Sequence, residues 1–95
     1  MKKYFVVSLI KNGIVGGGIV ADPEAITYRT GKLTIPHEYR HIVMKYGDIC
    51  EVTKGWMFIL PTVTIEMRSG KEYTFVVFFG RNRLVDTLVS MGVGG

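Results

Sequence analysis

The stretch from residue 61 to residue 92, PTVTIEMRSGKEYTFVVFFGRNRLVDTLVSMG, changes its hydrophobic period once along its length. On both sides of Ser69-Gly70, apolar and polar residues alternate, and this period of two is typical of half-buried strands. After Gly80 the apolar residues recur at the spacing of one helical face. The stretch therefore predicts two strands joined by a tight turn, followed by one amphipathic helix from Asn82 to Met91.

The length of the turn decides which residues of the two strands face each other. A loop of residues 69–70 would set Ile65 against Thr74 and place apolar and polar side chains on a shared face. A loop of residues 68–70 sets Ile65 against Tyr73 and places a glycine at the left-handed position that such a loop requires. We therefore predict the longer loop. Its register sets Val63 against Phe75, Ile65 against Tyr73 and Glu66 against Glu72.

The chain upstream of this stretch reads as short strands that Gly, Pro and Asp separate roughly every eight to twelve residues. Extended candidates cover residues 4–10, 14–21, 25–29, 33–35 and 49–54. Residues 37–46 fit either a helix or a strand. In total, about seven strands and one terminal helix indicate an antiparallel sandwich or barrel, because one helix cannot cover both faces of a parallel sheet.

Bulk composition indicates a single domain over residues 1–95. The chain is 47% hydrophobic, and Cys50 is its one cysteine, which excludes an intramolecular disulfide and suits a reducing compartment. Apolar runs fall well short of the ~20 residues that cross a bilayer, so we expect a soluble, cytoplasmic protein. The net charge of +4 is scattered along the chain, and we therefore expect no nucleic-acid partner.

Residues 37–41, His-Glu-Tyr-Arg-His, match the pattern H-E-x-x-H of zinc hydrolases. On a helix, His37 and His41 would bind zinc from one face, and Glu38 would activate a water molecule. Glu66 would be available as a third ligand. A proline directly before the motif and its strand-like flanks disfavour such a helix. The favoured interpretation is a polar loop that leads into a strand and binds no metal.

Two other features bear on cofactors and partners. Residues 16–18 are three glycines after a strand, but the next turn follows too soon for the helix of a dinucleotide site, so we expect no cofactor. Trp56 lies at a predicted strand end, and Val76 and Phe78 give a strand a second apolar face. We therefore predict that Trp56, Val76 and Phe78 contribute to a partner surface.

Four segments carry a family resemblance: GIVAD at 18–22, ITYRTG at 26–31, KYGDI at 45–49 and TIEMRSGKEYTF at 64–75. Together with the terminal Leu/Val helix, they resemble pleckstrin-homology-like domains, most closely the small bacterial and GRAM-type members. The resemblance implies a mainly β fold: a seven-stranded, partly open antiparallel barrel of two near-orthogonal sheets, capped by the C-terminal helix. It also implies a scaffold without enzymatic activity that binds phosphoinositides, peptides or other proteins.

Three functions are compatible with the sequence. The first is a non-enzymatic binding module that engages a protein partner or self-associates, for example as a dimer, through the partner surface or an open sheet edge. The second is peripheral binding to anionic membrane lipid, with Lys11, Arg29 and Lys32 as anion contacts around the barrel mouth. The third is a zinc-dependent hydrolase that uses the H-E-x-x-H motif.

Overall fold

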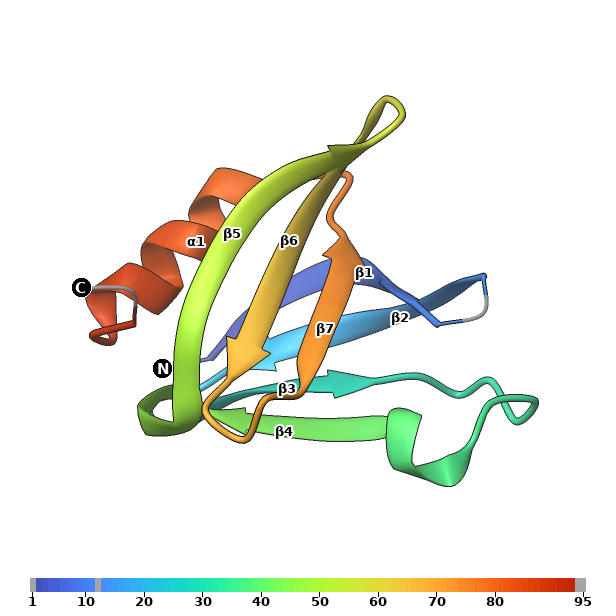
Figure 1. Ribbon diagram of the computed structural model, residues 1–95, viewed down its shortest axis with the longest axis horizontal. Coiled ribbons are helices and arrows are strands. Elements are labelled where there is room, and N and C mark those ends of the chain that lie inside the picture. Colours follow the sequence, from blue (N-terminus) through green and yellow to red (C-terminus); the bar gives the residue numbers. More distant parts are fainter. Residues whose placement is uncertain (1, 12, 94–95) are drawn as a thin grey trace.

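The computed structural model describes residues 2–11 and 13–93 of the chain (Figure 1). Within them, seven antiparallel strands form one sheet in the order β4-β3-β2-β1-β7-β6-β5. The strands are β1 (Lys3–Ile10), β2 (Ile14–Ala21), β3 (Ala25–Arg29), β4 (His41–Lys45), β5 (Ile49–Met57), β6 (Leu60–Met67) and β7 (Glu72–Val76). The helical elements are the 3₁₀ helices η1 (His37–Tyr39) and η2 (Tyr46–Asp48) and the C-terminal α-helix α1 (Arg81–Ser90).

The sheet folds into a partly open barrel. Strands β1–β4 form one half, and β5–β7 form a second half that crosses the first steeply (Figure 1). β1 joins the halves, because it pairs with β2 along its whole length and with β7 at Ser8–Val76 and Leu9–Phe75. β4 and β5 are the two edges of the sheet, so the barrel is open between them. The predicted fold class, mainly β with seven antiparallel strands and one C-terminal helix, is confirmed.

A buried tyrosine explains one of the glycines in β2. Tyr28 of β3 lies in the core, with its ring 5.3 Å from that of Phe75 in β7. Its hydroxyl donates to the carbonyl of Val15 at 2.8 Å. A Cβ on Gly17 would come within 2.9 Å of the Tyr28 ring and would also clash with the carbonyl of Arg29. Only glycine lets β2 pass this close to Tyr28.

The β6–β7 hairpin has the predicted three-residue loop and register. The loop holds residues 68–70, and across its base the amide of Met67 donates to the carbonyl of Lys71 at 2.8 Å. Gly70 has a φ of 94°, which is the left-handed conformation that the prediction required. The facing pairs include Val63 with Phe75, Ile65 with Tyr73 and Glu66 with Glu72.

α1 begins one residue earlier than predicted, at Arg81, and a glycine is its N-cap. The N-cap is Gly80, at a φ of 79°, and no side chain caps the helix there. Asn82, which was predicted as the first residue of the helix, lies within its first turn. The left-handed glycine redirects the chain out of β7 without a side-chain cap, and this effect of backbone conformation is not visible in the hydrophobic period.

The C-terminal end of α1 closes in a Schellman motif. Gly92 has a φ of 90°, and its amide donates to the carbonyl of Val89 at 2.9 Å. The amide of Val93 donates to the carbonyl of Leu88 at 3.1 Å, and the Val93 side chain is buried. Leu88 and Leu84 are fully buried, so α1 docks through the predicted face. No helix in the described residues has the length and apolar character that a membrane crossing needs.

The segment that fitted both a helix and a strand becomes a short helix and then a strand. Residues 37–39 form η1, and β4 pairs with β3 from His41 onward. Residues 33–35, predicted to be extended, lie instead in a turn and bend. Arg40 causes this compact loop, because its Nε donates to the carbonyl of Ile35 at 3.2 Å and its carbonyl accepts from the amide of Thr30 at 3.1 Å.

β5 is longer than predicted. The strand passes through Gly55 and ends at Met57, and β6 begins at Leu60, so residues 58–59 alone form the turn. The predicted strand ends at residue 54, directly before Gly55, and proline, like glycine, was expected to separate strands. Gly55 and Pro61 both lie within paired strands, because cross-strand pairing keeps the backbone extended where local preference would end a strand.

Candidate functional site

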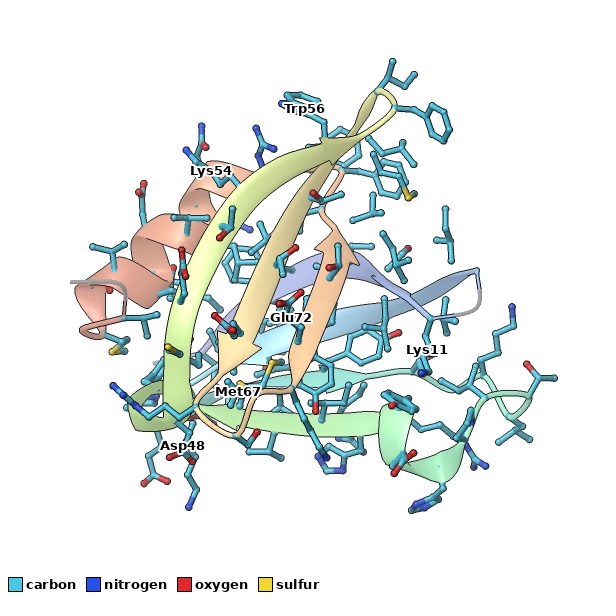
Figure 2. All side chains as sticks on the ribbon, in the orientation of Figure 1. Lys11, Asp48, Lys54, Trp56, Met67 and Glu72 are labelled. Atoms are coloured by element: carbon cyan, nitrogen blue, oxygen red, sulfur yellow. The ribbon has the colours of Figure 1, made fainter. Side chains whose placement is uncertain are left out.

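Large apolar side chains are exposed at the β5–β6 turn and on the connection from β7 to α1. We call Trp56, Phe58, Ile59, Phe78 and Phe79 the apolar tip. Their exposed fractions are 64%, 94%, 86%, 48% and 85%, respectively. The β5–β6 hairpin projects beyond the rest of the sheet (Figure 1), and Figure 2 shows Trp56 near its free end. Single exposed apolar residues are ordinary, but a group of large ones marks a contact site.

Hydrogen bonds hold the two parts of the tip together. The amide of Val77 donates to the carbonyl of Pro61 at 2.9 Å, and Arg81 Nη1 donates to the carbonyl of Gly55 at 2.7 Å. The Arg81 guanidinium also lies 4.6 Å from the centre of the Trp56 ring, which is a cation–π distance. Phe78 and Phe79 of the tip lie in sequence between Val77 and Arg81, so these anchors hold them beside the base of the hairpin.

The turn at the tip departs from ordinary turn chemistry. Phe58 has a φ of 57°, and it is the one residue other than glycine with a positive φ in the described part of the chain. Two-residue hairpin turns favour glycine or asparagine at such a position. A side chain in the left-handed region costs roughly 1–2 kcal/mol. Because the Phe58 side chain is almost fully exposed, it recovers little of that energy by packing within the fold.

The surroundings of the tip are positively charged. Residues 52–65 and 73–85, which contain the tip and its flanks, include Lys54, Arg81 and Arg83 and no Asp or Glu. Lys54 Nζ lies 3.5 Å from Asn82 Oδ1 of α1, so the lysine stands beside the first turn of the helix. Apolar side chains with cations at their base suit either an aromatic-rich protein interface or an anionic lipid surface.

Two of the three residues predicted for a partner surface belong to the tip, and the third does not. Trp56 and Phe78 are exposed, whereas Val76 is fully buried. Val76 pairs with Thr62 of β6 and with Ser8 of β1, and both of these residues are buried as well. The prediction for Val76 was wrong because β7 is a central strand, covered on the face opposite the main core as well as on the core face.

The prediction from sequence missed Phe58, Ile59 and Phe79. A signal for the first two was present, because residues 56–60 are an unbroken apolar run between a glycine and a proline. Without knowledge of the β5–β6 register, that run reads as a buried segment. The pairing of β5 with β6 shows that its centre is the tip of a hairpin.

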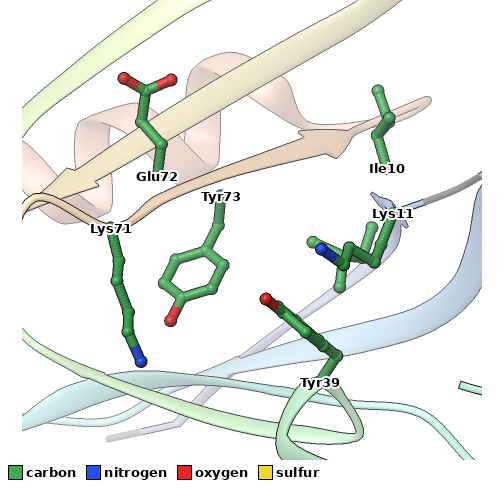
Figure 3. Close-up of a pocket in the computed structure, with 7 residues that line it drawn as sticks. Ile10, Lys11, Tyr39, Lys71, Glu72 and Tyr73 are labelled. Carbon is green, nitrogen blue, oxygen red and sulfur yellow. The ribbon is translucent and has the colours of Figure 1, made fainter. Parts of the chain in front are cut away.

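A pocket of about 340 Å³ lies at the other end of the second half-sheet, where β7 begins. We call it the tyrosine pocket. Figure 3 shows Tyr39 and Tyr73 pointing toward each other across it, with Lys11 and Lys71 beside them and Glu72 turned away. The Lys11 ammonium lies 4.4 Å from the centre of the Tyr39 ring. Two ammonium groups and two phenolic hydroxyls are a combination that attracts a small anion.

The structure brings together two of the three predicted anion contacts. Lys11 and Lys32 line a second pocket of about 330 Å³, which adjoins the tyrosine pocket at Lys11. Arg29 is elsewhere, in a depression on the outer face of β1–β4 with Tyr4 and His41. The prediction missed Lys71, because only the folding of the sheet brings the start of β7 near the end of β1.

The H-E-x-x-H motif lacks the geometry that zinc hydrolases use. His37 and Glu38 lie in the three-residue helix η1, and His41 is the first residue of β4, so the two histidines do not share a helical face. Glu66 lies in β6, where it pairs with Glu51 and not with either histidine. Among residues 2–11 and 13–93, no group of three or more potential metal ligands is present.

Shifted pKa values occur in groups that support the fold. The backbone amides of Glu24 and then Ala25 donate to Asp22 and hold the pKa of its carboxyl below the ordinary value. Burial raises the pKa of Tyr28 and of Tyr46, and the nearby Asp22 carboxylate raises that of Tyr46 further. The Tyr46 hydroxyl donates to the carbonyl of Asp22 at 2.7 Å, so this group helps to hold the β2–β3 turn.

Comparisons with known proteins show the fold and no more. No family model matches the chain, and no curated protein matches it. Among solved structures, the chain is similar to the C-terminal domain of an unknown protein from Leishmania infantum. The TM-score is 0.77, the identity is 12%, and the match covers 94% of this chain and 80% of that one. At that identity, the similarity establishes that the two chains share a fold.

Proposed function

We propose that this chain is a non-enzymatic binding module with a pleckstrin-homology-like fold and that the apolar tip is its contact surface. The strand order, the open barrel and the terminal helix support the fold type. The observation that carries the function is the exposure of Phe58, Ile59 and Phe79, each at least 85%, at one end of the protein.

We expect the tip to reduce the stability and the solubility of the free protein. Exposed groups of large apolar residues promote association in water. The conformation of Phe58 adds backbone strain that a glycine would avoid. A residue that harms the isolated fold in both respects is best explained by a contact that it makes with something else.

The open sheet edges are weaker candidates for the contact. β4 has five residues, and short edge strands discourage pairing with another chain. β5 has nine residues, but its register shifts between Ile49 and Glu51, and Arg81 already binds the carbonyl of Gly55. A bulge and a covering side chain are both features that protect an edge.

A second candidate function is the binding of a small anion or an anionic headgroup in the tyrosine pocket. Lys11 and Lys71 face this pocket together with two tyrosine hydroxyls, which favours it. The pocket and the apolar tip lie at opposite ends of β7, so one flat surface does not contact both. The two candidates therefore predict different sets of damaging substitutions.

The tip carries its own reporter, because Trp56 is the one tryptophan of the chain. The 95-residue chain, labelled with 7-azatryptophan at position 56 so that its emission is excited apart from the tryptophans of other proteins, would be mixed separately with the membrane and soluble fractions of a cell lysate, and acrylamide quenching of this residue would be measured. We expect one fraction to shift the emission to shorter wavelength and to protect Trp56 from the quencher. The double variant Phe58→Gly/Ile59→Asn keeps Trp56 and should lose this protection. Equal protection of both proteins, or of neither, would refute the proposal.

A further inference from the structure

We infer that the apolar tip inserts into the surface of an anionic membrane. The inference rests on the proposed function, since it names the partner of the same contact surface. It places the end of the β5–β6 hairpin at the boundary between the lipid headgroups and the acyl chains. The tyrosine pocket, at the opposite end of β7, then remains in solvent.

The shape of the tip favours lipid over a protein partner. Phe58 and Ile59 form a two-residue turn at the end of a projecting hairpin, and each is at least 86% exposed. A partner must therefore surround both side chains. A protein does so only with a deep apolar groove, whereas fluid lipid closes around any projecting side chain. Lysines line the two pockets at the barrel mouth, so neither of these two offers the tip of a second copy a purely apolar groove.

The order of residues along the hairpin matches the layers of a membrane surface. Phe58 and Ile59 are outermost, and aliphatic and phenyl groups enter the acyl boundary. Trp56 lies closer to the body of the protein, with the Arg81 guanidinium over its ring. Tryptophan prefers the level of the headgroups, because its indole combines an apolar face with an N–H donor.

The charge around the tip specifies an anionic surface. Lys54 and Arg81 lie at the base of the hairpin that carries the tip, and residues 52–65 and 73–85 contain no Asp or Glu. Basic residues near a membrane gain energy from the negative potential of anionic headgroups. Carboxylates at these positions would be repelled. An apolar tip with cations alone at its base therefore complements a lipid surface that carries negative charge.

The test uses vesicles of phosphatidylcholine, with and without added phosphatidylserine, and the chain of residues 1–95. We expect the chain to sediment with the vesicles that contain phosphatidylserine, and the Trp56 emission to shift to shorter wavelength. Lipids with brominated acyl chains should quench Trp56, because bromine quenches at short range. Binding should weaken as salt is raised and should be weaker on phosphatidylcholine alone.

Four variants separate the tip from the rest of the surface. Phe58→Gly/Ile59→Asn should bind vesicles at least about tenfold more weakly, and Lys54→Gln about fivefold more weakly. Leu33→Asn is the matched control, because Leu33 is 77% exposed but lies in the loop between β3 and β4, and its binding should be unchanged. Lys11→Gln/Lys71→Gln removes the two ammonium groups of the tyrosine pocket, which lies away from the inserted tip, and should weaken binding less than Lys54→Gln does. Thermal melts confirm that each variant is folded.

The outcomes distinguish this inference from the proposed function. Vesicle binding that survives Phe58→Gly/Ile59→Asn but is lost in Lys11→Gln/Lys71→Gln would overturn both and assign lipid to the tyrosine pocket. If the chain does not bind the vesicles, its sedimentation without vesicles shows whether it self-associates. Self-association that depends on Phe58 and Ile59 would overturn the membrane partner and retain the tip as the contact surface. Absence of vesicle binding, self-association and Trp56 protection in lysate fractions would overturn both.

Discussion

Of the two turns at the ends of β6, one has the residue that turn geometry favours and the other does not. The turn to β7, residues 68–70, has a glycine at its positive-φ position, Gly70, and polar residues before it. The turn from β5, residues 58–59, has Phe58 at its positive-φ position and exposes it almost completely. The first turn serves the stability of the hairpin, and the second weakens it. Local conflicts of the second kind are concentrated at functional sites, which supports the assignment of the contact surface to the tip.

The two turns can be compared by stability only if both belong to one cooperative scaffold. The substitution Leu88→Asp tests whether they do. Leu88 is fully buried on the docking face of α1. Replacing a buried leucine with alanine already costs about 2–5 kcal/mol, and an aspartate adds an unpaired charge. Because small domains have roughly 5–15 kcal/mol in total, Leu88→Asp should abolish the cooperative thermal transition. A melt close to that of the wild type would show that α1 does not hold the scaffold together.

Gly70→Ala tests the turn that follows the rules. Alanine at a φ of 94° is strained, and the free energy of unfolding should fall by roughly 1–2 kcal/mol. The space around Gly70 is open, so the loss reports backbone conformation and not a steric clash. Urea unfolding measures the change. Gly31→Ala is the control, because Gly31 also has open space but has no positive φ, and it should cost less.

Phe58→Gly tests the turn that breaks the rules, and its effect should have the opposite sign. Glycine removes the strain at a φ of 57° but adds freedom to the unfolded chain, so the net gain in stability should be about 0.5–1 kcal/mol. Urea unfolding again measures it. A loss of stability above 1 kcal/mol would mean that Phe58 supports the fold, and the contrast between the two turns would disappear.

The same contrast explains which parts of the fold were predictable. The β6–β7 register followed from local rules, because residues 68–70 agree with the alternation on both sides. The β5–β6 turn did not follow, because Gly55 and Pro61 suggest breaks and residues 58–59 give no turn signal. Only the pairing between strands that are already aligned determines that turn.

The candidate site was predictable to a smaller extent. Trp56 and Phe78 were predicted because large apolar residues near strand ends are candidates for a partner surface whatever the strand order is. Val76 was misjudged and Phe79 was missed, because burial depends on which elements cover each face of β7. That information is tertiary, and alternation along one strand does not contain it.

The end of β6 next to the turn of residues 68–70 has one unfavourable interaction, a repulsion between carboxylates. Glu66 faces Glu72 of β7 on one side and Glu51 of β5 on the other. Like charges directly opposite each other destabilise a sheet by about 0.2–1 kcal/mol. Glu66→Gln should therefore raise the free energy of unfolding by an amount in that range, and the gain should shrink as salt is raised. A gain that is independent of salt would point to a cause other than charge repulsion.

The β2–β3 turn gives an effect with a different signature, a dependence on pH. Asp22 caps this turn through the amides of Glu24 and Ala25, at 2.8 and 2.9 Å, and these hydrogen bonds lower its pKa. Because the folded pKa lies below the unfolded one, the contribution to stability is complete above the unfolded pKa. It is lost as the pH falls through the folded pKa. Asp22→Ala should therefore be less stable than wild type at neutral pH, and acid should destabilise it less steeply in urea unfolding. Phe58→Gly changes no ionisable group, so its curve against pH should run parallel to that of the wild type. If the stability of Asp22→Ala plotted against pH also ran parallel to that of the wild type, the carboxylate would not stabilise the β2–β3 turn. The turn at residues 68–70 would then be the one tested turn in which the residue required by local chemistry supports the fold.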